Sequence, residues 1–193
     1  MHEIRQATVD RVPAICAMLT RAFADDPMVV WPVGNVDDLG SVQHRLFELV
    51  DVPFTELGLV WEIGDAFAAA AWIPPDSIAA YVGIDVATRP IVRRLTADAG
   101  RRWEAMWDWI EERIPSEPLW LLDHVGVDPT HQGKGLGGTL IEHGLELARK
   151  DGVGAFLETA VPANVAYYER FGFTVVEEGD APLGGPHIWF MRL

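Results

Sequence analysis

A glycine-rich stretch in the chain has the spacing of an anion-binding turn. Residues 123–138 read DHVGVDPTHQGKGLGG, and four glycines and one lysine lie within residues 133–138. Glycines let backbone N–H groups converge without obstruction by side chains, and the first N–H groups of a helix have no partner inside it. The stretch follows an apolar run that ends at Val127 and precedes a helical pattern from about Leu136. We therefore predict that it binds a pyrophosphate.

The spacing of the glycines also fits the turn of a dinucleotide-binding fold. Gly133, Gly135 and Gly138 match G-x-G-x-x-G, and Glu158 lies 20 residues further on, where a dinucleotide-binding fold keeps its ribose-binding acid. Against a dinucleotide fold, residues 128–132 separate the apolar run from the first glycine, and only 55 residues follow Gly138. A Walker A loop is excluded because no G-x-x-x-x-G-K-[ST] occurs. A nucleotide-dependent oxidoreductase stays open as an alternative.

The elements around the turn alternate between strands and helices. We expect strands at residues 119–127, 153–161, 173–178 and 187–193, and helices at 135–152 and 163–172. Earlier in the chain the patterns predict a strand at 2–8, a helix that ends near DDP at 25–27, a helix at 41–56, a hairpin at 57–75 and two short helices after it. This alternation predicts an α/β chain with a parallel crossover inside a mixed sheet.

Composition limits the functional classes. The 193 residues, 49% hydrophobic and 23% charged, predict one globular domain over residues 1–193. No signal peptide or spanning segment is recognised, so we expect a soluble cytoplasmic protein, monomer or homodimer, without membrane partners. Cys16 is the single cysteine, so a cysteine-based metal site is not expected. The net charge of −14 disfavours nucleic acid and favours cationic small molecules or basic peptides.

The motifs resemble those of a known family. Gln132, Gly135 and Gly137 match Q/R-x-x-G-x-G/A, and NVAYYERFGF at residues 164–173 resembles a second conserved segment of the GCN5-related N-acetyltransferases. AFADDP at 22–27 and AAAAWIPPDS at 68–77 are further similar to the puromycin N-acetyltransferase-like members. The resemblance implies a single-domain α/β fold: a mixed, mostly antiparallel sheet splayed between two central parallel strands, with helices on both faces. Acetyl-CoA would lie in the V between these strands, and the acceptor amine would enter from the other side.

The resemblance also implies which residues hold the coenzyme. The Val125 amide would stabilise the negative charge that develops on the thioester oxygen, and the Val127 amide would bond the pantetheine. Asn164 would cap its helix and reach the pantetheine as well. The pyrophosphate loop would comprise Gln132, Gly133, Lys134, Gly135, Gly137 and Gly138.

The same resemblance implies a catalytic acid, whereas the base stays open. Tyr168 matches the tyrosine that protonates the leaving thiolate. The candidates for the base are Asp123, His124 and Glu158, acting directly or through water, although Glu158 has an alternative role in holding the substrate amine. Cys16 lies far from the motifs in sequence, so we expect direct transfer in a ternary complex.

The acceptor site is predicted from residues outside the motifs. Asp25 and Asp26 in AFADDP would border the acceptor cleft, and the indoles of Trp31 and Trp72 would hold an aromatic or nucleoside body. The alternative is that both tryptophans belong to the core. We predict an acetyl-CoA-dependent N-acetyltransferase for a small primary amine that is cationic or aromatic. A peptide acceptor and a non-catalytic acyl-CoA binding module remain as alternatives.

Overall fold

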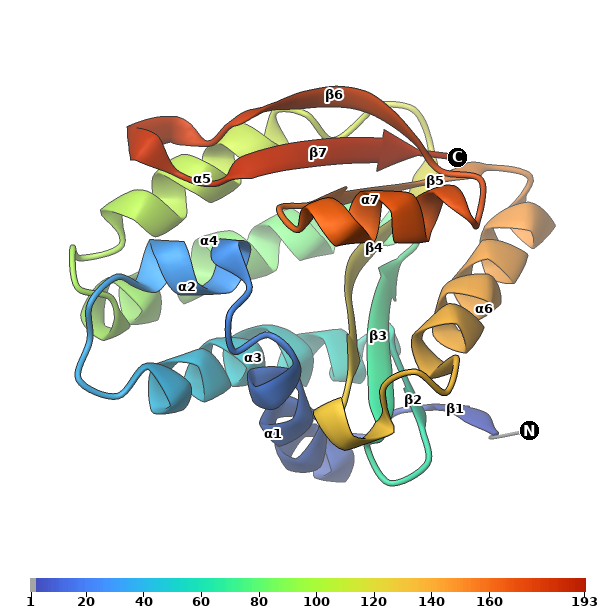
Figure 1. Ribbon diagram of the computed structural model, residues 1–193, viewed down its shortest axis with the longest axis horizontal. Coiled ribbons are helices and arrows are strands. Elements are labelled where there is room, and N and C mark those ends of the chain that lie inside the picture. The colour runs from blue at the N-terminus through green and yellow to red at the C-terminus, as the bar shows by residue number, and fades with distance from the viewer. Residues whose placement is uncertain (1–2) are drawn as a thin grey trace.

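The computed structural model describes residues 3–193, which form one mixed sheet flanked by helices (Figure 1). The strands, in chain order, are β1 (Ile4–Gln6), β2 (Val60–Ile63), β3 (Ala68–Ile73), β4 (Leu119–Val127), β5 (Gly154–Thr159), β6 (Thr174–Asp180) and β7 (His187–Arg192). The helices are α1 (Val12–Ala22), α2 (Pro27–Val33), α3 (Leu39–Glu56), α4 (Ile78–Leu95), α5 (Arg101–Glu111), α6 (Leu136–Asp151) and α7 (Pro162–Glu169). The strand order is β1-β2-β3-β4-β5-β7-β6. Within residues 3–193, β4 and β5 form the single parallel pair.

Two hydrophobic clusters fill the two faces of this sheet. One cluster joins the sheet to helices α1, α3, α4 and α5, through side chains such as Leu19, Phe54 and Met106. The other joins the opposite face to α6 and α7, through side chains such as Leu140 and Tyr168. The fold class expected from the sequence is therefore confirmed. No helix within residues 3–193 combines the length and apolar character needed to cross a bilayer.

The predicted elements differ from the structure mainly between the first helix and β4. A helix that the sequence analysis missed, α2, begins directly after DDP, because the Asp26 carboxylate accepts a hydrogen bond from the Met28 N–H and Pro27 occupies the first helical position. After the hairpin, α4 is not short but spans 18 residues and contains Pro90. These two helices supply much of the wall of the cavity described below.

The central strands separate because their pairing is short. β4 pairs with β5 only at Leu119↔Gly154, Trp120↔Ala155 and Leu121↔Phe156. In Figure 1 the remainder of β4 runs beside β3, away from β5. The amide edge of the second half of β4 is therefore left without a strand partner.

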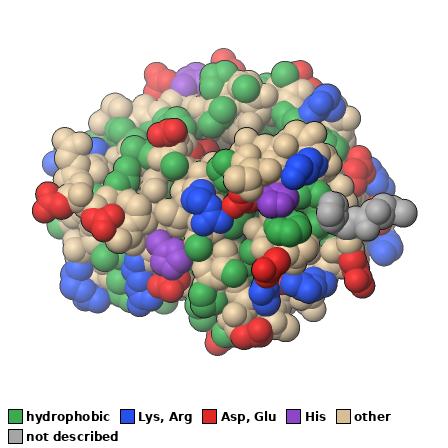
Figure 2. Space-filling model, turned by 60° about the horizontal axis from the view of Figure 1, so that its bottom comes forward, with side chains coloured by type: hydrophobic (Ala, Val, Ile, Leu, Met, Phe, Trp, Pro, Cys, Tyr) green, Lys and Arg blue, Asp and Glu red, His purple; other side chains and the backbone are tan. Residues whose placement is uncertain are grey.

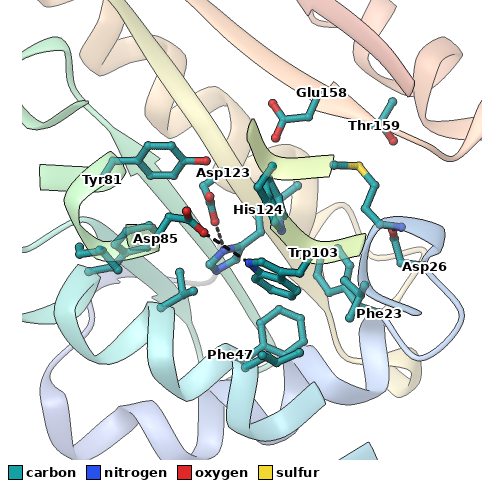
Figure 3. A pocket seen from close by; sticks show the side chains of 18 of the residues that line it. Phe23, Asp26, Phe47, Tyr81, Asp85, Trp103, Asp123, His124, Glu158 and Thr159 are labelled. Carbon is teal, nitrogen blue, oxygen red and sulfur yellow. Dashed lines mark hydrogen bonds and ion pairs between the residues drawn. The ribbon is translucent and has the colours of Figure 1, made fainter. Parts of the chain in front are cut away.

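A bulge in β4 changes which side chains face the helices α1–α5. Leu122 pairs with Trp72 and His124 pairs with Ala71, so Asp123 is an extra residue on β4 opposite consecutive residues of β3. A bulge re-aims the side chains that follow it. Asp123 and His124, although adjacent in sequence, thus both point into the same cavity (Figure 3).

Candidate active site

A groove of about 990 Å³ lies between β4, the glycine-rich loop and α7. Gly133 and Gly135 have φ of 74° and 79°, and a Cβ at either position would meet nothing within 4 Å. Helix α6 begins after Gly135, and its first intrahelical hydrogen bond runs from the Thr139 N–H to the Gly135 carbonyl at 3.0 Å. The N–H groups before Thr139 therefore lie free at the end of the helix that favours anions.

The edge of β4 adds two further amides to this groove. The Asp128 N–H donates to the Phe67 carbonyl at 2.9 Å, on the side of β3. Because antiparallel ladders alternate, the amides of Val127 and Val125 point to the opposite edge, where β5 no longer pairs. Both residues line the groove. Their N–H groups are placed to bond an extended ligand as a strand would.

Of the other residues expected to hold a coenzyme, Gln132 and Asn164 line the groove and Lys134 does not. Gln132 lines the groove, and its Nε2 donates to the Val127 carbonyl at 3.4 Å. Asn164 also lines it, but it does not cap α7: its Nδ2 donates to Thr159 Oγ1 at 3.3 Å, and Val161 is the N-cap residue. Lys134 is exposed and points back to the loop, with Nζ 3.3 Å from the Thr130 carbonyl oxygen, and it does not line the groove.

Gly137 and Gly138 lie closest to α7. A Cβ on either residue would come within 3.4 Å of the Tyr167 hydroxyl, so both positions require a small residue for this close approach. Arg21, which sequence reasoning missed, also lines the groove, and its Nη2 lies 2.6 Å from Asp128 Oδ2. This ion pair ties α1 to the start of the glycine-rich loop.

A cavity of about 160 Å³ lies on the other side of β4, among α2, α3, α4 and α5. Its wall is aromatic and apolar, with five carboxyl groups set into it: Asp26, Asp85, Glu111, Asp123 and Glu158. The cavity and the groove share five lining residues: Phe23, Asp26, Val125, Asn164 and Tyr168. The two spaces therefore meet beside the unpaired edge of β4.

His124 is held between two carboxylates. Its Nδ1 lies 2.7 Å from Asp123 Oδ2, and its Nε2 lies 3.3 Å from Oδ1 of Asp51, a fully buried residue of α3. Phe47 packs against the imidazole edge-on, with ring centroids 6.3 Å apart. Burial alone would lower the pKa of His124, but the charges of Asp51 and Asp123 raise it to about 10. The imidazole is therefore protonated near neutral pH, which makes it a poor proton acceptor.

Glu158 faces Asp123 across the separation of β4 and β5. Burial, and then the negative charge of Asp123, raise the pKa of Glu158 to about 8. Its Oε2 is buried without a hydrogen-bond partner among residues 3–193. Glu158 is thus a carboxyl group able to exchange a proton near neutral pH.

Tyr168 lies at the junction of groove and cavity. Burial raises the pKa of this phenol well above its ordinary value, so it keeps its proton in the neutral range. Asp26 lies at the same junction, and burial raises its pKa against the opposing effect of the Met28 N–H. The junction therefore brings a proton donor and carboxyl groups to one place.

The two tryptophans expected at the acceptor site lie elsewhere. Trp72 is fully buried on the α6 face, where its Nε1 donates to the Leu140 carbonyl at 3.2 Å and its ring occupies the space that a Cβ on Gly144 would need. An acceptor in the cavity cannot reach it, so that expectation is wrong, and its alternative of a core tryptophan holds. Trp31 does not line the cavity, and its ring packs 5.5 Å from the Arg102 guanidinium. The indoles in the wall are instead Trp103 and Trp107 of α5.

One face of the molecule carries charges of both signs, unlike the acidic wall of the cavity. In the space-filling view, basic and acidic side chains are interspersed across the face shown (Figure 2).

Cys16 is fully buried, and burial raises the pKa of its thiol well above its ordinary value. It offers no reactive thiolate to this site.

Comparison with known proteins agrees with this architecture. The acetyltransferase (GNAT) family model matches residues 59–173, more than half of the chain. An uncharacterised N-acetyltransferase of Schizosaccharomyces pombe is 27% identical over an alignment of 170 positions, and the alignment covers 81% of this chain and 68% of the relative.

Solved structures share the fold at low identity. A Corynebacterium glutamicum structure described as histone acetyltransferase HPA2 and related acetyltransferase has a TM-score of 0.72 at 21% identity, covering 99% of this chain and 94% of the other. A Drosophila melanogaster polyamine N-acetyltransferase has a TM-score of 0.62 at 15% identity, covering 100% of this chain and 99% of the other. An Aedes aegypti arylalkylamine N-acetyltransferase has 0.69 at 15%, covering 100% of this chain and 98% of the other.

The family match decides whether the glycine-rich turn belongs to an acyl-CoA site or to a dinucleotide site. A dinucleotide-binding fold requires a doubly wound, largely parallel sheet, whereas this sheet has one parallel pair within the described residues. The nucleotide-dependent oxidoreductase is therefore excluded. GNAT enzymes use acyl-CoA, and the open glycine-rich turn, the free N–H groups of α6 and the unpaired amides of β4 fit such a coenzyme. The chain belongs to the GNAT family and is an N-acetyltransferase.

Proposed function

We propose that this chain, acting as one domain, transfers acetyl from acetyl-CoA to the primary amine of a small cationic molecule by direct attack in a ternary complex. The observation that carries the proposal is the junction at which the groove and the cavity share Val125, Asp26, Asn164 and Tyr168. A coenzyme in the groove and an amine in the cavity would meet there without a covalent relay through the protein.

The groove residues would bind the coenzyme and stabilise charge. Acetyl-CoA, when bound, would supply an activated thioester carbonyl at the junction. The free N–H groups at the start of α6 would bind pyrophosphate, and the Val127 amide would bond an extended chain. The Val125 amide would donate to an oxygen that gains negative charge during the reaction; one such donor contributes roughly 2.7–4 kcal/mol elsewhere. Tyr168 would hold the proton required by a departing thiolate.

Glu158 is the proposed proton acceptor. An amine arrives as an ammonium, because its pKa lies above neutral pH, and the charge of Asp123 together with Glu158 would attract it into the cavity. Glu158 in its carboxylate form would remove the proton before the nitrogen attacks. His124, already protonated, would fix Asp123 rather than act as the base.

The nature of the acceptor is supported by the shape of the cavity. The space has a volume of about 160 Å³, which suits a small molecule better than an extended peptide. Among the structural neighbours, one is named for polyamines and another for arylalkylamines, two classes of small amine. A peptide amine remains the second candidate, because the net charge of −14 would attract basic peptides as well and one structural neighbour is described as a histone acetyltransferase.

Replacement of Glu158 by glutamine tests the proposal. With a small amine and acetyl-CoA, we expect Glu158→Gln to lower kcat by on the order of 10²–10⁴-fold and to remove the limb of the kcat/KM profile that rises with pH toward about 8. The matched control is Glu178→Gln on the exposed face of β6, which should keep wild-type kinetics. A variant that keeps the limb and wild-type kcat would contradict the assignment of Glu158. If wild-type enzyme preferred basic peptides over small amines by tenfold or more in kcat/KM, the small-molecule acceptor would be wrong.

A further inference from the structure

The acceptor cavity extends beyond the junction, toward the helices α4 and α5. Its far wall contains Tyr81 and Asp85, one turn apart on α4, and Glu111, Trp103 and Trp107 of α5. None of these residues is required for the transfer step at Glu158 and Tyr168. Two of them, Tyr81 and Glu111, have side-chain polar groups that make no hydrogen bond or ion pair within residues 3–193.

Tyr81 is an uncommon wall residue because it is buried and its hydroxyl group makes no hydrogen bond within residues 3–193. Its side chain is only 7% exposed and lines the cavity. In Figure 3 the phenol points into the cavity toward Asp123. Burial and then the charges of Asp123, Glu158, Glu111 and Asp85 raise its pKa. The hydroxyl is therefore protonated and free to bond a ligand that enters the cavity.

Glu111 differs from its neighbour Asp85 in having no counterion. Asp85 Oδ2 lies 2.6 Å from the Arg89 guanidinium, and Asp85 Oδ1 accepts a weak hydrogen bond from Trp103 Nε1 at 3.4 Å. Glu111 is half-buried, and no lysine, arginine or histidine within residues 3–193 lies within 4 Å of its carboxylate. Burial and the charge of Asp85 raise its pKa, and the charge of Arg89, which makes no ion pair with Glu111, opposes them; a cation bound directly beside Glu111 would stabilise its carboxylate.

We propose that Tyr81 and Glu111 form a distal subsite that binds a second cationic group of the acceptor, so that the preferred substrates are diamines or similar dications. The inference rests on the proposed function and narrows its substrate class. The reacting ammonium would lie at Asp123 and Glu158, and the second cation would lie at Glu111, with the Tyr81 hydroxyl accepting a hydrogen bond from it.

The charges and rings around the subsite favour a cation over a neutral group. Of the five carboxyl groups in the cavity wall, Asp85 is paired with Arg89 and Asp123 with His124, whereas Asp26, Glu111 and Glu158 have no ion pair within the described residues. Tyr81 lies one turn from Asp85 on α4, and its hydroxyl points toward Asp123 (Figure 3), so an acceptor running past its ring would present one cation to each end of the cavity. The indoles of Trp103 and Trp107 add faces that attract cations.

Three amines of equal chain length test the subsite. Pentylamine, 5-amino-1-pentanol and 1,5-diaminopentane differ only in the far group, which is apolar, neutral polar or cationic. We expect kcat/KM for the diamine to exceed both others by at least tenfold, with shorter and longer diamines assayed alongside to locate the optimal length. In Glu111→Gln the ratio of diamine to pentylamine should fall at least fivefold, and in Tyr81→Phe it should fall in the same direction. Glu112→Gln, the exposed neighbour on α5, is the matched control and should keep the wild-type ratio.

Calorimetry separates this inference from the proposed function. The diamine and pentylamine are titrated into the wild type and the Glu111→Gln variant in the presence of CoA, so that binding is measured without transfer. Tighter diamine binding that depends on Glu111 supports the subsite even if no amine is acetylated, in which case only the proposed function fails. Equal kcat/KM for diamine and pentylamine, a preference for the amino alcohol, or a diamine preference that survives Glu111→Gln would overturn the subsite while leaving acetyl transfer intact.

Discussion

The coenzyme groove and the acceptor cavity meet at one junction but are built from different parts of the chain. The groove presents mainly backbone: the free N–H groups of α6, the left-handed glycines Gly133 and Gly135, and the amides at the edge of β4. The cavity presents side chains that come from separate segments of the chain, α2, α3, α4, α5, α7 and the central strands β4 and β5. Their chemistry is correspondingly different, with donors for an anion in the groove and carboxylates for a cation in the cavity.

This difference teaches where specificity resides. The backbone groups that form the groove, called the backbone cradle below, depend on glycine and on strand geometry, so most side-chain substitutions leave them unchanged. The cavity changes its chemistry whenever one wall residue changes. We therefore expect substitutions in the groove to alter coenzyme affinity for every acceptor equally, whereas substitutions in the cavity should alter the choice of acceptor.

A larger effect is expected at the junction than in either of the two regions that meet there. Tyr168→Phe keeps the ring that packs against Phe173 but removes the hydroxyl, and it should lower kcat by on the order of 10²-fold with an almost unchanged Kd for the coenzyme. Steady-state kinetics and calorimetry measure the two quantities. If kcat stayed at the wild-type value, Tyr168 would be a packing residue, and the junction would lack its proposed acid.

A smaller effect is expected in the backbone cradle. Gly135→Asp places a carboxylate at the N-terminus of α6 and should weaken acetyl-CoA by at least roughly tenfold, or about 1.4 kcal/mol. Gly152→Asp is a matched control, because Gly152 has φ of 72° and open space around it but lies at the other end of the same helix. Both variants carry the same backbone strain, so a loss of affinity confined to Gly135→Asp identifies the anion site. Equal losses would instead indicate a general effect on α6.

The cradle could be predicted from sequence because its residues are contiguous and its chemistry belongs to the main chain. Gln132, Gly135 and Gly137 fall within six residues, between a strand and a helix whose patterns are clear. The splayed mixed sheet was predicted through the resemblance to the family, and the structure shows its physical basis in the three-residue pairing of β4 with β5. Lys134 shows the limit of this reasoning, since its place in the loop did not reveal that its side chain turns back to Thr130.

The cavity could not be predicted in the same way, because sheet faces and distant helices determine it. All six residues of β3 are buried, so no alternation of polar and apolar residues indicated that Trp72 faces α6. The bulge at Asp123, which turns both Asp123 and His124 into the cavity, has no signature in LLDHVGV. Asp51 belongs to no motif of the sequence, and only the tertiary contact with His124 shows its importance.

The smallest effect is expected at this buried cluster, where it can be measured as a dependence of stability on pH. His124 has a folded pKa of about 10 against an ordinary value near 6.5. Its stabilising contribution is therefore complete below about pH 6.5 and is lost as pH rises through about 10.

Asp51→Asn removes one of the two carboxylates and should bring the pKa of His124 closer to its ordinary value. We expect the melting temperature of the variant to lie below that of the wild type at pH 6.5, and this difference to become smaller toward pH 9.5. In a protein of this size, each kcal/mol of unfolding free energy shifts the melting temperature by about 2–4 °C. Glu158 is present in both proteins, so its own titration cancels in the difference, and Asp37→Asn on the surface is the control. NMR titration of the His124 ring gives an independent readout: an unshifted pKa in Asp51→Asn would show that Asp123 alone holds the imidazolium, and the cavity would then owe its fixed charge to the bulge in β4 rather than to α3.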